Sequence, residues 1–263
     1  MTQIGTAARE RRRIGAVAID VLTEAEAVET VLSAVDSRRP LMVAFANAHS
    51  VNLARTDADF AAAMDDALVL NDGIGVDLAS KWLFRQRFPG NLNGTDFVPA
   101  LIAAAQKPLR LFLIGGRPGT AQRVGEILAD RFPHVTVVGA LDGYFASSAE
   151  LGQVQQIADA KANLVLLALG QPLQERWAQR HWRSVAGPCL CVGALLDFLA
   201  GNVPRAPSLV RRFRLEWLFR LAHEPRRLAR RYLIGNATFL VLVLRSGRRT
   251  GQKPASRNST SGN

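Results

Sequence analysis

Six short apolar runs, rich in Val, Leu and Ile, recur along the chain and lack the alternation of polar and apolar residues seen in half-exposed strands. Such runs are typical of strands buried on both faces, as in a parallel sheet. Helix-like segments lie between them, most clearly at 119–132 and 148–161. The pattern predicts an α/β fold, an open and mostly parallel sheet with helices on both faces. The predicted strands are 41–46, 67–72, 109–116, 135–141, 164–170 and 189–196.

The pattern ends after Asp197, where a Pro/Arg hinge, "GNVPRAPS", leads into an amphipathic stretch rich in arginine. We therefore expect a domain at 14–203, a helical appendage at 204–245, and a disordered polar tail at 246–263. Residues 1–13 are predicted to be a flexible basic N-terminus. The longest apolar run, 232–244, is shorter than the roughly 20 residues that cross a bilayer, and no signal peptide is expected.

Positive charge is concentrated at the C-terminal end. Residues 204–263 hold 14 of the 33 Lys and Arg residues but only two of the 22 acids. This local excess predicts an anionic partner, and arginines mixed with aromatic residues on an amphipathic helix favour an anionic membrane surface. A docked helix with a solvated basic face is the alternative, and nucleic acid is disfavoured because no recognition motif accompanies the charge. The arginines proposed to contact membrane or diphosphate are Arg211, Arg212, Arg220, Arg226, Arg227, Arg230 and Arg231.

Polar residues follow the predicted strands, where ligands bind in open α/β sheets. In "ALVLNDGIGVD" the strand ends at Asn71-Asp72 and two glycines follow. Asp72 either caps the next helix or is a reactive carboxylate within reach of a substrate. The candidate rim comprises Asn47, His49, Asn71, Asp72, Gly115 to Gly119, Asp142 to Tyr144, Gln171 to Glu175, and Asp197.

Other motifs leave two interpretations open. The loop "GGRPG" could bind phosphate at a helix N-terminus or merely connect strand to helix. The amides in "GQPLQE" could bind sugar hydroxyls, or the segment could simply begin a helix. Asp57 and Asp59 are better explained by helix capping than by metal binding. The four histidines have no ligand-like spacing, so we expect no metal site and no cofactor. Cys189 and Cys191 are expected to be buried thiols in a reducing compartment.

Eight segments in order, "FANAHSVNLA", "NDGIGVDLA", "NGTDFVPAL", "LFLIGGRPG", "DGYF", "LGQPLQERW", "VGALLDFLAGNVPRAPS" and "EWLFRLAHEPRRLARRYL", resemble the WecG/TagA/CpsF family of bacterial glycosyltransferases. The resemblance implies a Rossmann-like fold and transfer, with inversion, of a sugar from a UDP-sugar to a polyprenyl-diphosphate-linked saccharide. It also places the protein peripherally on the cytoplasmic face of the bacterial inner membrane. No oligomeric state is predicted.

The resemblance also implies roles for individual residues. Asp72 falls on the proposed general base and Gln174 on a second catalytic position, and the arginine-rich appendage matches a membrane-targeting segment thought to complete the active site. Donor and acceptor binding is expected from Asn47, Asn71, Gly73, Gly75, Asn93, Gly94, Asp96, Gly115, Gly116, Gly143, Tyr144, Gln171, Asp197 and Arg205.

Two departures from the teichoic-acid branch concern the donor. Phe45 replaces a threonine and Asn91 replaces an arginine, both at the donor end of the pocket. The chain looks closer to the exopolysaccharide branch, which includes the xanthan-type β-1,4-glucosyltransferase, and this favours UDP-glucose. The alternatives are an N-acetylmannosaminyl transferase of the same family and a non-catalytic α/β protein that binds nucleotide or nucleic acid.

Overall fold

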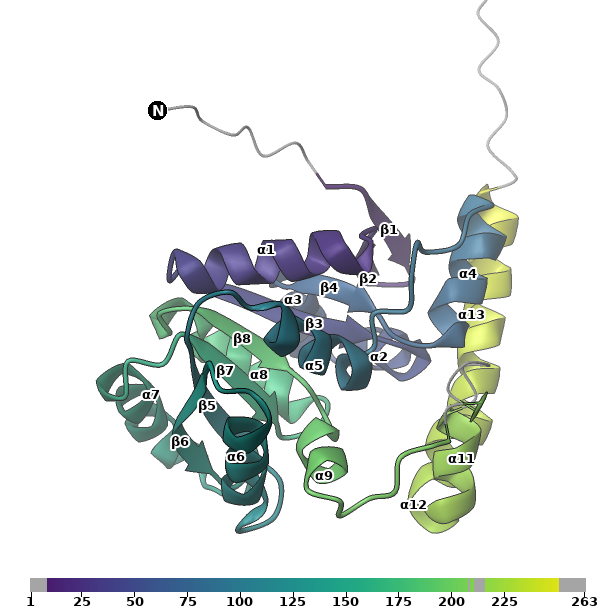
Figure 1. The fold of residues 1–263 in the computed structure, drawn as a ribbon. Coiled ribbons are helices and arrows are strands. Elements are labelled where there is room, and N and C mark those ends of the chain that lie inside the picture. Colours follow the sequence, from purple (N-terminus) through teal and green to yellow (C-terminus); the bar gives the residue numbers. More distant parts are fainter. Residues whose placement is uncertain (1–8, 208, 211–215, 251–263) are drawn as a thin grey trace, which may run out of the picture.

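A six-stranded parallel sheet forms the centre of the protein (Figure 1). The computed structural model describes residues 9–207, 209–210 and 216–250. The sheet order β4-β3-β8-β7-β5-β6 confirms the predicted α/β fold with an open parallel sheet. The strands are β3 (Leu41–Ala46), β4 (Leu68–Asn71), β5 (Leu109–Gly115), β6 (Val135–Leu141), β7 (Leu164–Ala168) and β8 (Pro188–Cys191).

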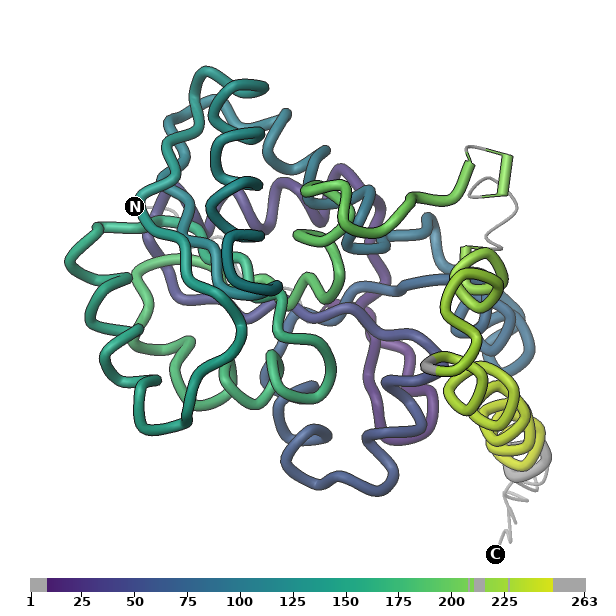
Figure 2. The backbone as a smooth tube through the Cα atoms, turned by 90° about the horizontal axis from the view of Figure 1, so that it is seen from below, coloured from purple at the N-terminus to yellow at the C-terminus, as the bar shows by residue number. Residues whose placement is uncertain are grey.

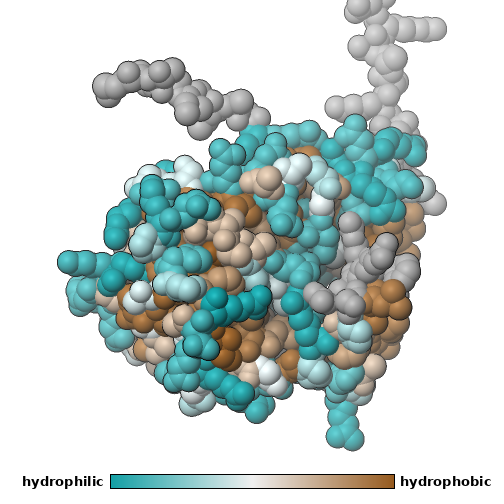
Figure 3. Space-filling model, in the orientation of Figure 1, coloured by the Kyte–Doolittle hydropathy of each residue, from teal (hydrophilic) through white to brown (hydrophobic). Residues whose placement is uncertain are grey.

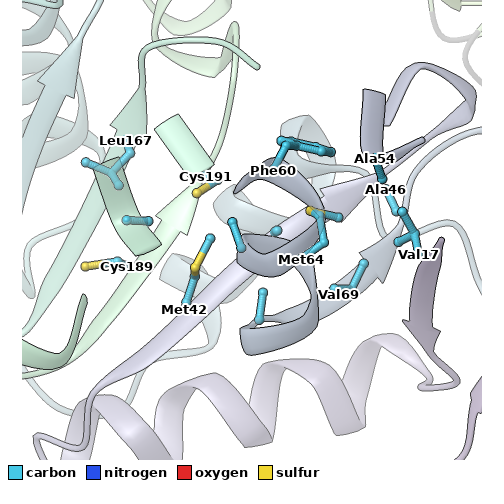
Figure 4. Close-up of a cluster of buried hydrophobic side chains, with 14 of the residues drawn as sticks. Val17, Met42, Ala46, Ala54, Phe60, Met64, Val69, Leu167, Cys189 and Cys191 are labelled. Atoms are coloured by element: carbon cyan, nitrogen blue, oxygen red, sulfur yellow. The ribbon is translucent and has the colours of Figure 1, made fainter. Parts of the chain in front are cut away.

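Helices cover both faces of the sheet because both faces of its strands are apolar. In β3, Met42 and Ala44 point into one hydrophobic core while Val43 and Phe45 point into the other. Figure 4 shows part of the first core, which contains Met42 and Cys189 from the strands and Phe60 and Met64 from a covering helix. Each large side chain buried in this way stabilises the fold by about 1.5–3 kcal/mol. The first face is covered by α2 (Ala48–Ala54), α3 (Ala58–Asp66), α7 (Glu150–Asp159) and α8 (Leu173–His181), and the second by α1 (Glu24–Asp36), α5 (Gly94–Ala104), α6 (Thr120–Arg131) and α9 (Leu195–Leu199).

The carboxyl ends of the six parallel strands lie along one edge of the sheet, and several pairs of neighbouring strands there continue into helices on opposite faces. Neighbouring β5 and β7 continue into α6 and α8, which cover opposite faces, and neighbouring β3 and β8 continue into α2 and α9, which also do so. Crevices form where consecutive helices diverge in this way. The predicted rim residues follow all six strands and are therefore spread along this whole edge.

The expected flexible N-terminus is wrong for residues 11–13. They belong to β1 (Arg11–Ile14), which pairs antiparallel with β2 (Val17–Asp20). Arg12 is buried, and its guanidinium donates to Ser80 Oγ at 3.0 Å and to the carbonyl of Arg87 at 3.0 Å. A buried guanidinium needs such partners, so at least part of the N-terminal basic cluster is structural. Residues 1–8 lie outside the described residues.

The C-terminal segment is helical and packs against the body. It contains α11 (Glu216–His223), α12 (Pro225–Ala229), a π-helical turn (Arg230–Ile234) and α13 (Gly235–Thr250). Figures 1 and 2 show α13 alongside α4 (Ile74–Phe84), and α13 also contacts α2. Phe239 and Val243 are buried in the first core. The predicted disordered tail is wrong for residues 246–250, which are helical, and the rest of it lies outside the described residues.

Apolar side chains of this segment are partly buried against the body and partly exposed. Among the described residues, none of the helices is both long and apolar enough to cross a bilayer. Figure 3 shows hydrophobic residues gathered at the right of the molecule, over the region of α11 and α13. The exposed apolar side chains there include Leu218, Leu240, Val241 and Leu244.

Candidate active site

A cavity of about 680 Å³ opens at the carboxyl ends of β3 and β4, and α11 and α13 form its outer wall. Its volume lies in the usual range of small-molecule sites. Asn47 and His49 line it from the N-cap and first turn of α2, which follows β3, and Asp72 and Gly73 line it from the loop after β4. One end of the cavity is therefore polar and lies at the sheet, whereas the other, between α4 and α13, is mainly apolar.

Asp72 points into this cavity and does not cap a helix. Gly73 occupies the N-cap position of α4 with φ 87°, and no side chain caps that helix. The Asp72 backbone N–H donates to the carbonyl of Ala46 at 2.8 Å, which extends the ladder between β3 and β4 by one residue. Asn47 Nδ2 donates to Asp72 Oδ2 at 3.2 Å. The strand end thus fixes the carboxylate, and the capping interpretation is wrong.

The surroundings of Asp72 suit a general base. Burial raises the pKa of Asp72 above its usual value, and the nearby Asp96 carboxylate raises it further. The hydrogen bond from Asn47 and the charges of Arg231 and Arg220 oppose this shift. A carboxylate whose pKa is nearer to neutrality takes a proton more readily once it is ionised.

His49 lines the same cavity but is a weaker base. Burial, followed by the positive charge of Arg231, lowers the pKa of His49 to about 4. Its ring is therefore neutral at pH 7 and holds a proton poorly. Of these two side chains, Asp72 is the one suited to accept a proton.

Two arginines of the appendage reach the cavity. Arg220 lies over the Phe198 ring with its Cζ 5.5 Å from the centroid, and Arg231 lies over Tyr232 at 5.7 Å. The buried Nε of Arg220 has no hydrogen-bond partner among the described residues. Both guanidinium groups therefore stand where an anionic ligand in the cavity would meet them.

The other arginines predicted to contact membrane or diphosphate are either exposed away from the cavity or have side chains that the structure does not describe. Arg226 and Arg230 are exposed and do not line the cavity. Arg211 and Arg212 lie outside the described residues, as does the side chain of Arg227. Their expected contacts with membrane or diphosphate stay predictions.

A third carboxylate in the cavity, beside Asp72 and Asp96, is that of Glu216, which was not among the predicted site residues. It begins α11, and its pKa is raised mainly by burial and then by the charge of Asp72, whereas Arg205 and Arg220 oppose the shift. Only the packing of the appendage against the body brings Glu216 to Asp72, 144 positions earlier in the numbering. The sequence carries no local signal of this contact.

The "NGTD" motif forms one wall of the polar end. Asn93 caps α5, with its Oδ1 accepting from the Asp96 N–H at 3.0 Å and its Nδ2 donating to Asp96 Oδ2 at 2.9 Å. Asp96 also forms an ion pair with Arg205, whose side chain is at the surface. A Cβ on Gly94 would lie 3.2 Å from the Phe45 ring. Asn93 and Asp96 therefore line the cavity, and Gly94 permits close packing.

Three other predicted residues around Asp72 have roles in packing or backbone geometry. Asn71 is fully buried, and its Nδ2 donates to the carbonyl of Gly90 at 2.7 Å. A Cβ on Gly75 would lie 3.4 Å from Ala48 Cβ and 3.6 Å from the Phe239 ring, so this glycine lets α13 approach α4. Gly73 has a positive φ and open space beside it, so it adopts a backbone geometry that is strained for other residues.

The buried Gln174 side chain forms hydrogen bonds to two loops. Its Nε2 donates to Glu175 Oε1 at 2.8 Å and to the carbonyl of Cys191 at 3.1 Å, and its Oε1 accepts from the N–H groups of Gly170 and Gly193. The amide thereby joins the loops after β7 and β8. The nearby Gln171 amide donates to the carbonyl of Phe45 and to Ser50 Oγ. A catalytic contact from Gln174 stays a prediction, because its described contacts are those of a positioning residue.

Glu175 is a fully buried carboxyl group. Burial raises its pKa to about 7, despite hydrogen bonds from Gln174 and Gln171, and its Oε2 has no partner among the described residues. The unfolded chain should ionise near 4.5. Between about pH 4.5 and 7 the folded state holds a proton on Glu175 that the unfolded state has lost. The contribution of Glu175 to the free energy of unfolding is therefore complete below about pH 4.5 and is lost as the pH rises to about 7.

We therefore expect Glu175→Gln to remove a pH dependence of stability. Relative to the variant, the wild-type protein should lose about 3 kcal/mol of unfolding free energy between pH 4.5 and 7, because each pKa unit corresponds to about 1.4 kcal/mol. Urea unfolding at several pH values measures this difference. Glu29→Gln, at an exposed position, is the control and should follow the wild type. A wild-type profile parallel to that of Glu175→Gln would contradict the assignment.

The glycine-rich half of the predicted site lies at the carboxyl ends of β5, β6 and β7. The Gly143 N–H donates to the carbonyl of Gly116 at 2.9 Å, and a Cβ on Gly115 would lie 2.4 Å from the carbonyl oxygen of Ala168. Tyr144 is 73% exposed at this edge. None of these residues lines the cavity around Asp72. The structure thus divides the predicted site into two parts of one sheet edge.

Asp197 and the candidate metal ligands have local structural contacts. Asp197 Oδ1 accepts from Asn202 Nδ2 at 3.2 Å in the turn that leads to the appendage. Asp57 caps α3 through the Phe60 N–H and pairs with Arg176 at 2.7 Å, which confirms the capping interpretation. In the part of the chain that the structure describes, no three His, Cys, Asp or Glu side chains gather as a metal-binding group. Cys189 and Cys191 are buried free thiols, as predicted.

An α/β sheet with a buried carboxylate and cationic groups at one cavity is an arrangement suited to group transfer between anionic substrates. Residues 12–253 match the model of the glycosyl transferase WecG/TagA/CpsF family. The chain belongs to this family, as its motifs predict, and it is a glycosyltransferase. Family membership thereby replaces the alternative of a non-catalytic nucleotide- or nucleic-acid-binding protein.

Two curated relatives carry the same name, N-acetylglucosaminyldiphosphoundecaprenol N-acetyl-beta-D-mannosaminyltransferase. The protein from Bacillus subtilis (strain 168) is 31% identical over 185 residues, which cover 69% of this chain and 71% of the relative. The protein from Bacillus spizizenii (strain ATCC 23059 / NRRL B-14472 / W23) is 34% identical over 162 residues, which cover 60% of this chain and 62% of the relative. The matched segment thus spans less than two thirds of the second relative.

Proposed function

We propose that the protein transfers one hexosyl group, with inversion, from a UDP-sugar to a sugar linked to polyprenyl diphosphate. The observation that carries this proposal is the placement of Asp72 and two appendage arginines around one cavity. The family and the names of the relatives support a glycosyl transfer to a lipid-diphosphate acceptor. The cationic appendage supports action at an anionic membrane surface, which we place at the cytoplasmic face of the inner membrane.

The proposed reaction is a single displacement. An acceptor hydroxyl attacks the anomeric carbon, the bond from that carbon to the β-phosphate oxygen breaks, and UDP leaves with the bonding electrons. The hydroxyl proton passes to the Asp72 carboxylate as the new bond forms. Arg220 and Arg231 stabilise negative charge on the diphosphates in the cavity. With these cationic groups available, transfer needs no metal ion.

Two donor sugars remain candidates, and we favour glucose. Phe45 is buried against Phe97, with ring centroids 6.0 Å apart, and Asn91 Oδ1 accepts from the Gly73 N–H at 2.7 Å. Phe45 and Asn91, the two residues that differ from the teichoic-acid branch, thus make contacts within the protein. The names of the relatives favour N-acetylmannosamine as the second candidate.

A donor panel tests the proposal. Purified protein is incubated with UDP-glucose, UDP-N-acetylmannosamine and other UDP-sugars, each with glucose- or N-acetylglucosamine-diphosphate-polyprenol as the acceptor. We expect UDP release and product formation only when the acceptor is present, fastest with UDP-glucose, and the same rate in EDTA. Transfer from UDP-N-acetylmannosamine alone would overturn the donor assignment, and loss of activity in EDTA with recovery in Mn²⁺ would overturn metal independence.

A further inference from the structure

The far half of the cavity, between α4 and α13, is a groove lined mainly by apolar side chains, although Lys81 and Arg85 on the α4 side also line the cavity. Leu78 and Trp82 form one wall, and Leu240 and Leu244 form the other. These four side chains are between 40% and 57% exposed although they line a cavity. Four large apolar groups are thus held side by side and only partly covered, which is unusual for a surface without a ligand.

The groove has a regular construction. Ile74, Leu78 and Trp82 are four residues apart along α4, so they form one line on that helix. Leu240 and Leu244 repeat this spacing on α13. The line from Ile74 to Trp82 is about 12 Å long by the helical rise of 1.5 Å per residue. At the far end, a Cβ on Gly247 would lie 2.5 Å from Trp82 Nε1, so the indole packs closely against α13.

The groove is continuous with the polar end of the cavity. Ile74 begins α4 directly after the Asp72-Gly73 loop, and both halves belong to one cavity. Arg220 and Arg231 line the polar half. A ligand that occupies the whole cavity therefore places an anionic group beside the arginines and an apolar chain along α4 and α13. This pattern matches a ligand with an apolar chain joined to an anionic group, whereas a free nucleotide sugar has no apolar chain to cover Leu78, Trp82 and Leu244.

We propose that the groove between α4 and α13 binds the isoprene units of the acceptor that are nearest to its diphosphate. The inference rests on the proposed function, because that function supplies a substrate in which diphosphate and isoprenoid are joined. The groove holds the lipid chain out of water, and the arginines hold the diphosphate. The sugar that carries the attacking hydroxyl is thereby directed toward Asp72.

The test measures binding without a bilayer and without sugar. The probes are geranyl diphosphate and methyl diphosphate, and their affinities are compared by calorimetry. We expect the wild-type protein to bind geranyl diphosphate roughly 30-fold more tightly, because several apolar carbons leave water in the groove. Leu244→Ser and Leu78→Ser should each lower this ratio several-fold, since both side chains line the groove.

Val241→Ser is the matched control on the same helix. Val241 is exposed on α13 but does not line the groove, so the ratio should stay at the wild-type value. Equal binding of the two probes by the wild type, or an unchanged ratio in Leu244→Ser, would overturn the inference. If Leu244→Ser weakens retention on anionic vesicles but leaves the ratio unchanged, the groove is a membrane contact and the inference is wrong. A lowered ratio without sugar transfer in the donor panel would instead leave the groove in place and reject the proposed function.

Discussion

Asp72→Asn should lower kcat by roughly 10²–10⁴-fold, the usual contribution of a general base. The amide has the size of the carboxylate, and its oxygen can still accept the hydrogen bond from Asn47 Nδ2. We therefore expect the fold and the donor KM to change little. Steady-state transfer assays with saturating acceptor measure kcat, and thermal unfolding verifies the fold.

Glu216→Gln is the informative control because Glu216 is another carboxylate in the same cavity, whereas the third, Asp96, is paired with Arg205. It should retain most of the activity if Asp72 is the base. A near wild-type kcat in Asp72→Asn, together with a large loss in Glu216→Gln, would assign the base to the appendage instead. In the wild type, kcat/KM should fall as the pH drops through the raised pKa of Asp72, because protonation removes the base.

Arg231→Gln should lower kcat/KM by roughly 10²-fold, similar to the loss of one donor to a developing negative charge. Arg231 lines the cavity, and its charge lowers the pKa of Asp72. Its removal should therefore move the acid limb of the pH profile to higher pH as well as reduce the rate. A purely structural arginine would not produce that second effect.

Arg230→Gln provides the matched control one residue earlier. Arg230 is exposed and does not line the cavity, so the same loss of charge should leave the acid limb in place and change kcat/KM only slightly in a soluble assay. Equal losses in both variants would show that the appendage contributes only its overall charge. Equal and small effects would remove Arg231 from the reaction.

The sequence predicts the central sheet well because its strands are buried on both faces. The runs at 41–46 and 135–141 match β3 and β6 to the residue. The β1–β2 hairpin was missed because its strands have four residues each and three arginines in a row suggest a solvated end. In the fold, Arg12 is buried by α4, a contact between distant segments that no local pattern reveals.

The candidate site was predictable where a residue follows a strand. Asp72 and Asn47 come directly after β4 and β3, so the parallel sheet itself brings them together. Glu216 and Trp82 could not be found in this way, because helix packing and not strand order places them at the cavity. The glycines near β5 share the same sheet edge as Asp72, but they do not line its cavity, because β8 and β7 lie between β5 and β3.

The helices α4 and α13, which form two walls of the cavity, are held against the body by different kinds of contact. Along α4, Ser80 accepts from Arg12 Nη1, and the buried Asp77 accepts from the N–H of Phe88 and pairs with Arg87. The opposite helix rests largely on the apolar contacts of Phe239 and Val243, with a hydrogen bond from Asn52 to the carbonyl of Gly235. Directional bonds resist sliding more than apolar contacts do. If the cavity widens to admit a bulky glycolipid, we therefore expect α13 to move. We expect α4, and Asp72 just before it, to stay in place.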